Sequence, residues 1–301
     1  MMEVSNTADR APDRFEFVDP HVHFWDHGVS GLRWPYLEKG FEHPRLKNMH
    51  RLQAPQFTIT ELRAQAPSIN IMKVVHVQSA QEKRYGIETK WVEGMAELCG
   101  TPHAIVARVP IASPDLNRAL RENHSSGRFR GVRDMTAQES IGTDEFAAGF
   151  KRIVTQDLNV ELLVPYIHHP DVAELAMSRP EATVIIGHAG LAERRDSKYF
   201  SAWSKSIERL AKTPNIVIKI SALASGADPE WTVDSIRPWV LHCIEHFGPK
   251  RSMFASNWPV DRLYGTYEQL LEAYLEITSD LTCRDRRDLF VNTATTVYRM
   301  H

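Results

Sequence analysis

The sequence predicts a single-domain (β/α)₈ barrel, and three observations support this fold. Eight short runs rich in β-branched residues recur along the 301 residues, and helical patterns lie between them. The runs are nearly continuously apolar, as in strands that are covered on both faces. The first run continues into "DPHVHFWD" without a glycine-rich GxGxxG turn, which favours a barrel over a doubly wound open sheet.

The predicted strands share an apolar, β-branched composition, and "RGVRDM" is the weakest of them. In chain order they are Phe15–Phe24, Met72–Gln78, His103–Ile111, Arg130–Met135, Val160–Ile167, Ala182–Gly190, Asn215–Leu223 and Ser252–Trp258. The barrel domain is therefore expected to span residues 15–301. Residues 1–14 contain acids and no apolar segment, so a disordered tail is expected there and not a signal peptide.

The helical segments carry recognisable start and stop signals. "ETKWVEGMAELCG" has apolar residues at helical spacing and stops at Gly100, and Thr143 is the expected cap of "DEFAAGFKRIV". Two later helices are expected to end before Pro180 and Pro214, and Pro238 predicts a kink or a late start in "WTVDSIRPWVLHCIEHFG". Two more helices follow the last strand, and the final one is expected to pack near the N-terminal half of the barrel.

Composition argues against several classes of function. The net charge is −2, the pI is about 6.7, and no run of Lys or Arg offers a basic face, so binding to nucleic acid or to an anionic membrane is not expected. No run of 18 apolar residues is present. The three cysteines are widely spaced and form no CxxC pair, which is typical of free thiols in a reducing compartment. We therefore expect a soluble, cytoplasmic protein.

The segment after the first strand is long and rich in aromatic residues, Pro and Gly. In a barrel it would lie over the C-terminal face, where active sites are found. Its Trp34, Tyr36 and Phe41 can line a pocket or can simply pack the loop onto the rim. The sequence leaves both alternatives open.

Three histidines are placed where a barrel performs chemistry. His21 and His23 are two residues apart in a strand, so they point to the same face. His188 ends the sixth predicted strand among small residues. Imidazoles that converge at the mouth suit a divalent metal or the polarisation of a carbonyl group. Histidines that only satisfy hydrogen bonds in the core are the alternative.

Other polar residues are expected near the same rim. Gln78 ends the second strand, and Arg133 and Lys219 lie within apolar strands, where a charge needs a partner or a ligand. Both cations suit an anionic small molecule such as a carboxylate, and an internal ion pair with Asp134, Glu161 or another acid is the alternative. His168 and His169 can point inward or belong to a helix start with Pro170. There is no GxSxG or P-loop motif, so water is the expected nucleophile.

Several motifs resemble one branch of the amidohydrolase superfamily. They are, in order, "DPHVHFWD", "VHVQ", "GVRDM", "IIGHAGL", "VIKISAL", "GPKRSMFASNWPVDRLY" and "LFVNTATTVYR". The branch is the amidohydrolase-2 group, which includes 2-pyrone-4,6-dicarboxylate lactonase, L-fuconolactonase and 4-sulfomuconolactone hydrolase. The resemblance runs from about Phe15 to Arg299, with Trp258 in its most specific C-terminal motif. It implies a distorted barrel and hydrolysis, most often the opening of a lactone ring.

The resemblance also implies site residues. His21 and His23 match the histidine pair of the first strand, and His188 matches the histidine of the sixth. Asn257 stands where most relatives have an aspartate that serves as general base, and an amide has no titratable proton near neutral pH. Asp261, Asp26 or a histidine can replace that carboxylate.

Relatives differ over metal, so one zinc ion on His21, His23 and His188 and a metal-free mechanism are both open. No lysine suggests a binuclear centre. The leading hypothesis is a hydrolase of a small carboxylated lactone, with Gln78, Arg133, Lys219 and Trp258 as substrate-binding residues and with catalysis by the three histidines, Asn257 and Asp261. A metal-assisted decarboxylase and a non-catalytic binding barrel are the alternatives. The oligomeric state is open, although barrels of this size often form homo-oligomers.

Overall fold

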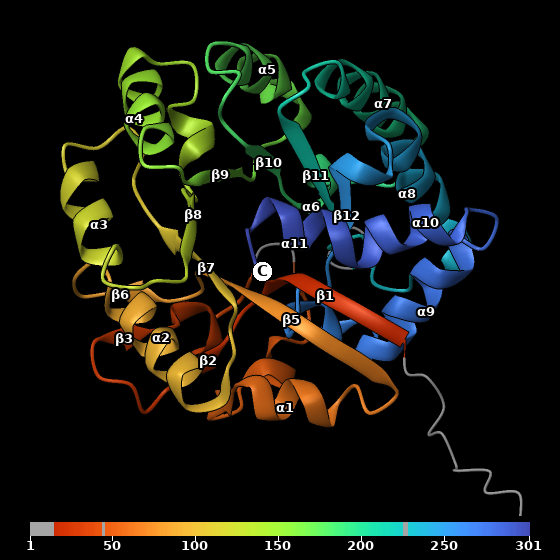
Figure 1. The fold of residues 1–301 in the computed structure, drawn as a ribbon. Helices are drawn as coiled ribbons and strands as arrows, with labels where there is room; N and C mark the ends of the chain where they lie inside the picture. The colour runs from red at the N-terminus through yellow and green to blue at the C-terminus, as the bar shows by residue number, and fades with distance from the viewer. Residues whose placement is uncertain (1–14, 44–45, 225–227) are drawn as a thin grey trace, which may run out of the picture.

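A computed structural model describes residues 15–43, 46–224 and 228–301, and it contains the predicted barrel. Eight strands form one sheet in the order β1-β5-β7-β8-β9-β10-β11-β12. Every pairing between neighbours in this sheet is parallel. Figure 1 shows the helices arranged around the outside of these strands. The predicted tail, residues 1–14, lies outside the described residues.

All eight predicted strands are present, although most are shorter than expected. The barrel strands are β1 (Phe15–Val22), β5 (Ile69–Val77), β7 (Ala104–Arg108), β8 (Phe129–Arg133), β9 (Asn159–Leu162), β10 (Val184–Ile186), β11 (Ile216–Ile220) and β12 (Ser252–Phe254). The helices are α1 (Ile59–Ala64), α2 (Ile87–Cys99), α3 (Leu116–Asn123), α4 (Asp144–Val154), α5 (His169–Met177), α6 (His188–Leu191), α7 (Ser197–Ala211), α8 (Val233–Phe247), α9 (Tyr267–Ile277), α10 (Cys283–Arg287) and α11 (Thr293–Val297).

The barrel closes narrowly between its first and last strands. In the part of the chain that the structure describes, a single isolated bridge joins Val22 to Trp258 at this seam. The backbone N–H of His23 donates to the carbonyl oxygen of Trp258 at 2.7 Å. Both contacts lie at the C-terminal ends of β1 and β12. The seam therefore holds the histidine pair and Asn257 next to each other.

Local signals set most helix boundaries. Helix α2 ends at Gly100, which adopts φ 73° and donates to the carbonyl of Ala96. Thr143 caps α4 by accepting from the backbone N–H of Phe146. The late start expected from Pro238 is wrong. Helix α8 begins at Val233, because Thr232 and Ser235 form a capping box, and the helix continues through the proline.

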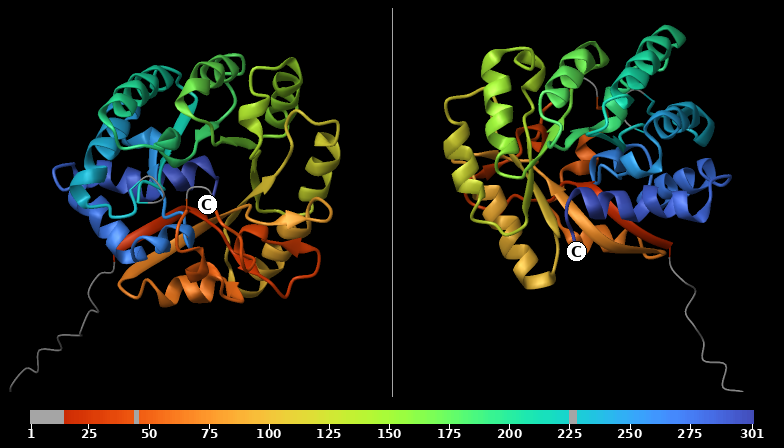
Figure 2. Two further views of the ribbon diagram at one scale, coloured as in Figure 1. Left: turned by 180° about the vertical axis from the view of Figure 1, so that it is seen from behind. Right: turned by 45° about the horizontal axis from the view of Figure 1, so that its top comes forward.

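The C-terminal segment covers the N-terminal end of the barrel, as predicted. Instead of one helix it forms α10, a π-helical turn (Asp288–Asn292) and α11. Asn159, at the start of β9, donates to the carbonyl of Val297 at 2.8 Å. Figures 1 and 2 show this segment lying across the strands. Tyr298 extends from it into the barrel, where its hydroxyl donates to Glu161.

The long first loop folds back onto the rim through short antiparallel pairs. Strand β2 (Trp25–Asp26) pairs with β4 (Gln56–Phe57), and β3 (Leu32–Arg33) pairs with β6 (Gln81–Glu82). Trp34 is buried and donates to Ser79 Oγ at 2.9 Å, and Tyr36 donates to the Ser79 carbonyl at 3.0 Å. Phe41 is exposed. Among the described residues, no helix has the length and apolarity needed to span a bilayer.

Candidate active site

His21 and His23 form a buried pair at the end of β1. Their Nε2 atoms lie 3.1 Å apart, and His23 donates from Nδ1 to the carbonyl of Val77 at 2.8 Å. A neutral imidazole has one N–H and one lone pair, so this bond leaves the lone pair of His23 on Nε2. His21 Nδ1 is buried without a hydrogen-bond partner. The pair therefore has one polar atom that is available to a ligand or a water molecule.

His188 follows β10, a strand that does not pair with β1, but its ring lies close to that of His21. Strand β10 ends at Ile186, two residues earlier than His188, and His188 adopts the left-handed region with φ 52°. Its Nδ1 lies 2.8 Å from Ser221 Oγ, just after β11. The centroid of its ring is 4.7 Å from that of His21. The structure thus brings together the three histidines that the sequence singled out.

Asn257 and Asp261 lie beside the histidines at the end of β12. Asn257 is buried in the left-handed region with φ 53°, and its Nδ2 donates to Asp261 Oδ1 at 2.7 Å. This bond fixes the orientation of the amide, because a carboxylate can only accept. The Asn257 side chain also lies close to His23. Because Nε2 of His23 carries a lone pair, the carbonyl oxygen of Asn257 does not accept from it and is left for a water molecule or a ligand at the histidine pair.

Burial dominates the electrostatics of these groups. It lowers the pKa of His23 to about 3 and holds the pKa values of His21 and His188 well below the usual range, and the nearby cations Arg133 and Lys219 lower them further. The imidazoles are therefore neutral at neutral pH. Burial raises the pKa of Asp261 to about 7, and the hydrogen bond from Asn257 lowers it by a smaller amount.

Arg133 is a buried cation that has no ion-pair partner among the described residues. It is 8% exposed, and its NH1 donates to the carbonyl of Gln78 at 3.3 Å. Within residues 15–43, 46–224 and 228–301, no carboxylate lies within ion-pair distance of Arg133. An unpaired buried charge is costly, so this position favours an anionic ligand.

Lys219 has the internal ion pair that the sequence left open as an alternative. It is fully buried, and its Nζ lies 2.8 Å from both carboxylate oxygens of Glu161. The side chain of Gln78 donates to the carbonyl of Ala80 at 2.6 Å. Trp258 packs against Phe24 and Phe57 and is 2% exposed. Substrate contacts by Lys219, Gln78 and Trp258 stay predictions.

The other candidates lie apart from the histidine cluster. Asp26 accepts from the backbone of Gly28 at 2.8 Å in a local turn. His168 lies 3.5 Å from Asp171 at the start of α5, and His169 is buried with Nδ1 2.9 Å from Ser206 on α7. The helix start was therefore the correct interpretation of this histidine pair.

Sequence reasoning missed Asp19. This fully buried carboxylate accepts from the backbone of His21 at 3.2 Å, from the backbone of Ser256 at 3.1 Å and from Tyr267 OH at 2.9 Å. It thereby ties β1 to the segment before Asn257. The strand alternation Asp19, His21, His23 was the available signal, because it places all three on one face.

The fit of a metal ion depends on the histidine pair. Two nitrogens bound to one tetrahedral zinc ion are about 3.3 Å apart, close to the 3.1 Å between the Nε2 atoms of His21 and His23. The Nδ1–H of His23 is also supported by a carbonyl, as is usual for a ligating histidine. In the described chain, these two and His188 do not form a group of ligand atoms all within 4.8 Å of one another. The spacing of His21 and His23 therefore fits a zinc ion, whereas His188 is not close enough to both of them to complete a set of three ligands.

Comparisons with known proteins agree with this arrangement. The amidohydrolase family model matches residues 18–300. The chain belongs to the amidohydrolase family. It is accordingly an enzyme of the hydrolase class.

Two curated proteins and one solved structure are similar to this amidohydrolase. An uncharacterized protein of Sinorhizobium fredii is 32% identical over 94% of this chain and 98% of its own length. An L-fucono-1,5-lactonase of Burkholderia ambifaria is 25% identical over 83% of this chain and 82% of its own. A crystal structure of a Burkholderia multivorans amidohydrolase with bound zinc has a TM-score of 0.79 at 22% identity, and the match covers 94% of this chain and 99% of that one.

Proposed function

We propose that this amidohydrolase opens a small carboxylated lactone or cyclic ester by attack of water on the ring carbonyl. The observation that carries the proposal is the convergence of His21, His23 and His188 beside Arg133, which is buried and has no ion-pair partner among the described residues. The similarity to an L-fucono-1,5-lactonase supports a lactone as the substrate class.

Arg133 would bind the carboxylate of the substrate and orient the ring. A guanidinium can form two parallel hydrogen bonds with a carboxylate, which fixes orientation as well as charge. Because the cation has no acidic partner in the described chain, the substrate carboxylate would supply the missing negative charge. The ring carbonyl would then lie over the histidines, where His188 can donate to its oxygen from Nε2 while its Nδ1 accepts from Ser221.

Asp261 is the proposed proton acceptor in place of the missing aspartate. Its Oδ2 is buried without a hydrogen-bond partner, and its pKa of about 7 suits a base at neutral pH. Asn257 would accept a hydrogen bond from the attacking water through its carbonyl oxygen and position that water. The water gives its proton to Asp261 as its oxygen bonds to the carbonyl carbon. The bond from that carbon to the ring oxygen then breaks, and Asp261 returns the proton to the ring oxygen, which gives an open-chain acid with a free hydroxyl group.

A divalent ion would be held by His21 and His23, with His188 or the Asn257 oxygen as further ligands. When bound, such an ion would polarise the carbonyl as a Lewis acid. The roles of Arg133, Asn257 and Asp261 do not depend on it. Metal analysis of the purified protein, with zinc near one equivalent on this pair, tests this part separately.

The proposal is tested with a panel of carboxylated lactones and their neutral methyl esters, in which ring opening is followed by acid release. Loss of the guanidinium in Arg133→Met should raise KM for the carboxylated lactones about tenfold to a hundredfold, since a hydrogen bond to a charged group contributes about 1.5–3 kcal/mol. The neutral esters should be affected much less.

The catalytic roles are tested by His188→Ala and Asp261→Asn, with Asp26→Asn as the matched control on a carboxylate outside the cluster. The first two should abolish ring opening and the control should retain it. Undiminished turnover by His188→Ala would exclude the proposed mechanism. Release of carbon dioxide instead of ring opening would identify a decarboxylase, and no turnover of any lactone would favour a binding barrel.

A further inference from the structure

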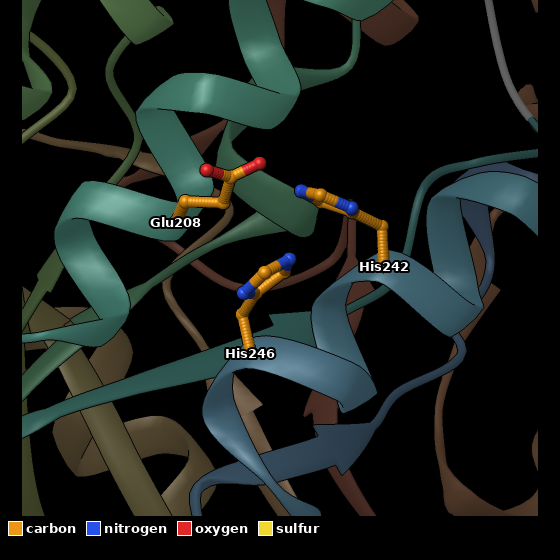
Figure 3. Close-up of side chains that lie close together, drawn as sticks. All are labelled: Glu208, His242 and His246. Atoms are coloured by element: carbon orange, nitrogen blue, oxygen red, sulfur yellow. The ribbon is translucent and has the colours of Figure 1, made fainter.

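A second group of metal-ligating side chains lies outside the barrel, on the helices α7 and α8. One carboxylate oxygen of Glu208 and one ring nitrogen each of His242 and His246 lie within 4.8 Å of one another. Figure 3 shows the Glu208 side chain extending from α7 towards the two imidazoles of α8. No other group of three such residues in the described chain meets this condition.

The two helices are held together directly beneath this group. His242 and His246 are four residues apart in α8, so they occupy the same face of the helix. The ring centroids of Trp203 in α7 and Trp239 in α8 are 4.5 Å apart, and Trp203 is fully buried. This aromatic contact fixes the distance between the helices, so the three ligands are presented by rigid elements.

The bonding state of these side chains suits metal ligation. His242 Nε2 donates to the carbonyl of Ser204 at 3.0 Å, which puts the proton on Nε2 and the lone pair on Nδ1. Such a bond to a carbonyl is the usual outer support of a ligating histidine. In the described part of the chain, Glu208 and His246 have no hydrogen bond or ion pair that metal binding would have to break.

The donor set indicates the class of ion. Two imidazoles and one carboxylate suit zinc and its neighbours nickel and copper, whereas magnesium and calcium prefer sites made of oxygen alone. Three protein ligands at the surface also leave a position for water. The imidazole rings of His242 and His246 have centroids 4.3 Å apart, so a small shift of these partly exposed side chains is enough to close around one ion.

We propose that Glu208, His242 and His246 form a peripheral site that binds one zinc ion or a related first-row dication and links α7 to α8. The site is separate from the barrel histidines, and it does not depend on the proposed lactone hydrolysis. An ion held here joins two helices that follow successive barrel strands. Its expected effect is therefore on stability and not on the chemistry at the barrel mouth.

The test is zinc binding to the whole protein after removal of metals with a chelator, measured by isothermal titration calorimetry. The His242→Ala/His246→Ala double variant should bind one equivalent of zinc fewer than the wild type. This difference counts the peripheral site whether or not the barrel histidines also bind zinc. The exposed His50, which belongs to no such group, provides the matched control, and His50→Ala should bind as many equivalents as the wild type.

Two further measurements keep the test decisive. Glu208→Gln keeps the size of the side chain at position 208 and both imidazoles but removes the negative charge of the ligand. It should weaken zinc binding at this site at least about tenfold, and it provides a second test if the double variant does not fold. Zinc should also raise the Tm of the wild type by more than that of either variant. Equal zinc stoichiometry in the wild type and the double variant, or an equal loss in His50→Ala, would overturn the proposal.

Discussion

Breaking the buried ion pair between Lys219 and Glu161 should destabilise the barrel strongly. The two residues are 0% and 4% exposed, and both Glu161 oxygens lie 2.8 Å from Lys219 Nζ. Lys219→Met leaves Glu161 buried with Tyr298 as its remaining donor. Removing one partner of such a pair costs about 3–5 kcal/mol, because the other charge stays buried and uncompensated.

The double variant Lys219→Met/Glu161→Gln separates this cost from the value of the pair itself. It removes both charges, so it should be less destabilised than Lys219→Met alone, with a coupling energy of about 2–3 kcal/mol in a double-mutant cycle. Urea unfolding followed by circular dichroism and by tryptophan fluorescence measures it, and coincident curves show that two-state analysis holds.

The same cycle decides between the two roles considered for Lys219. If each single substitution costs less than about 1 kcal/mol and the effects simply add, the ion pair does not support the barrel and the reasoning is refuted. In that case Lys219 would be available to a substrate. A double variant that folds and keeps the KM of the wild type for carboxylated lactones would instead confirm a structural role.

Three further predictions concern the cluster and the packing around it. Asn257→Asp places a second carboxylate against Asp261, whose pKa is already raised to about 7. The folded state would then hold protons more tightly, so its stability should fall as pH rises above 7 by more than in the wild type, as measured by urea unfolding. Burial lowers the pKa of His169 to about 3, so below pH 6.5 the unfolded state binds a proton that the folded state does not. His169→Asn should therefore reduce the loss of stability between pH 6.5 and 3 by up to about 1.4 kcal/mol per pH unit. An unchanged slope would contradict the burial argument. Gly149→Ala places a Cβ 2.0 Å from a backbone oxygen and should cost about 1–3 kcal/mol, whereas Gly94→Ala, in open space within a helix, should stabilise by about 0.5–1 kcal/mol; thermal unfolding of both variants measures the difference.

The architecture could be predicted because its signals are local and repeated. Apolar runs report strands covered on both faces, and caps such as Thr143 report where helices begin. The ends of the strands were less predictable. His188 was expected within the sixth strand, but that strand stops at Ile186 and the backbone turns into the left-handed region at His188, Ala189 and Gly190. Only the glycine among these three signals such a turn in the sequence.

Contacts between distant segments account for the features that the sequence did not predict. Asp19 acts through Ser256 and Tyr267, more than 230 residues further along the chain. No periodicity links such positions in one sequence, whereas Asn257 and Asp261 are close enough in sequence for their proximity to be expected. The orientation of the Asn257 amide is set by Asp261, which accepts from Nδ2, and this contact could be identified only in the structure.

The amide at position 257 changes the charge balance of the whole barrel mouth. Lys219 and Glu161 cancel each other, and Arg133 has no acidic partner among the described residues. An aspartate at position 257 would offset part of the positive charge of Arg133, whereas the neutral amide of Asn257 does not. The charge of Arg133 therefore favours an anionic ligand and disfavours a dication on His21 and His23, and the buried carboxylates of Asp19 and Asp261 offset part of this effect. Anion binding and metal binding are thus opposed in this barrel, and Asn257→Asp should strengthen zinc binding while it weakens the affinity for carboxylated ligands.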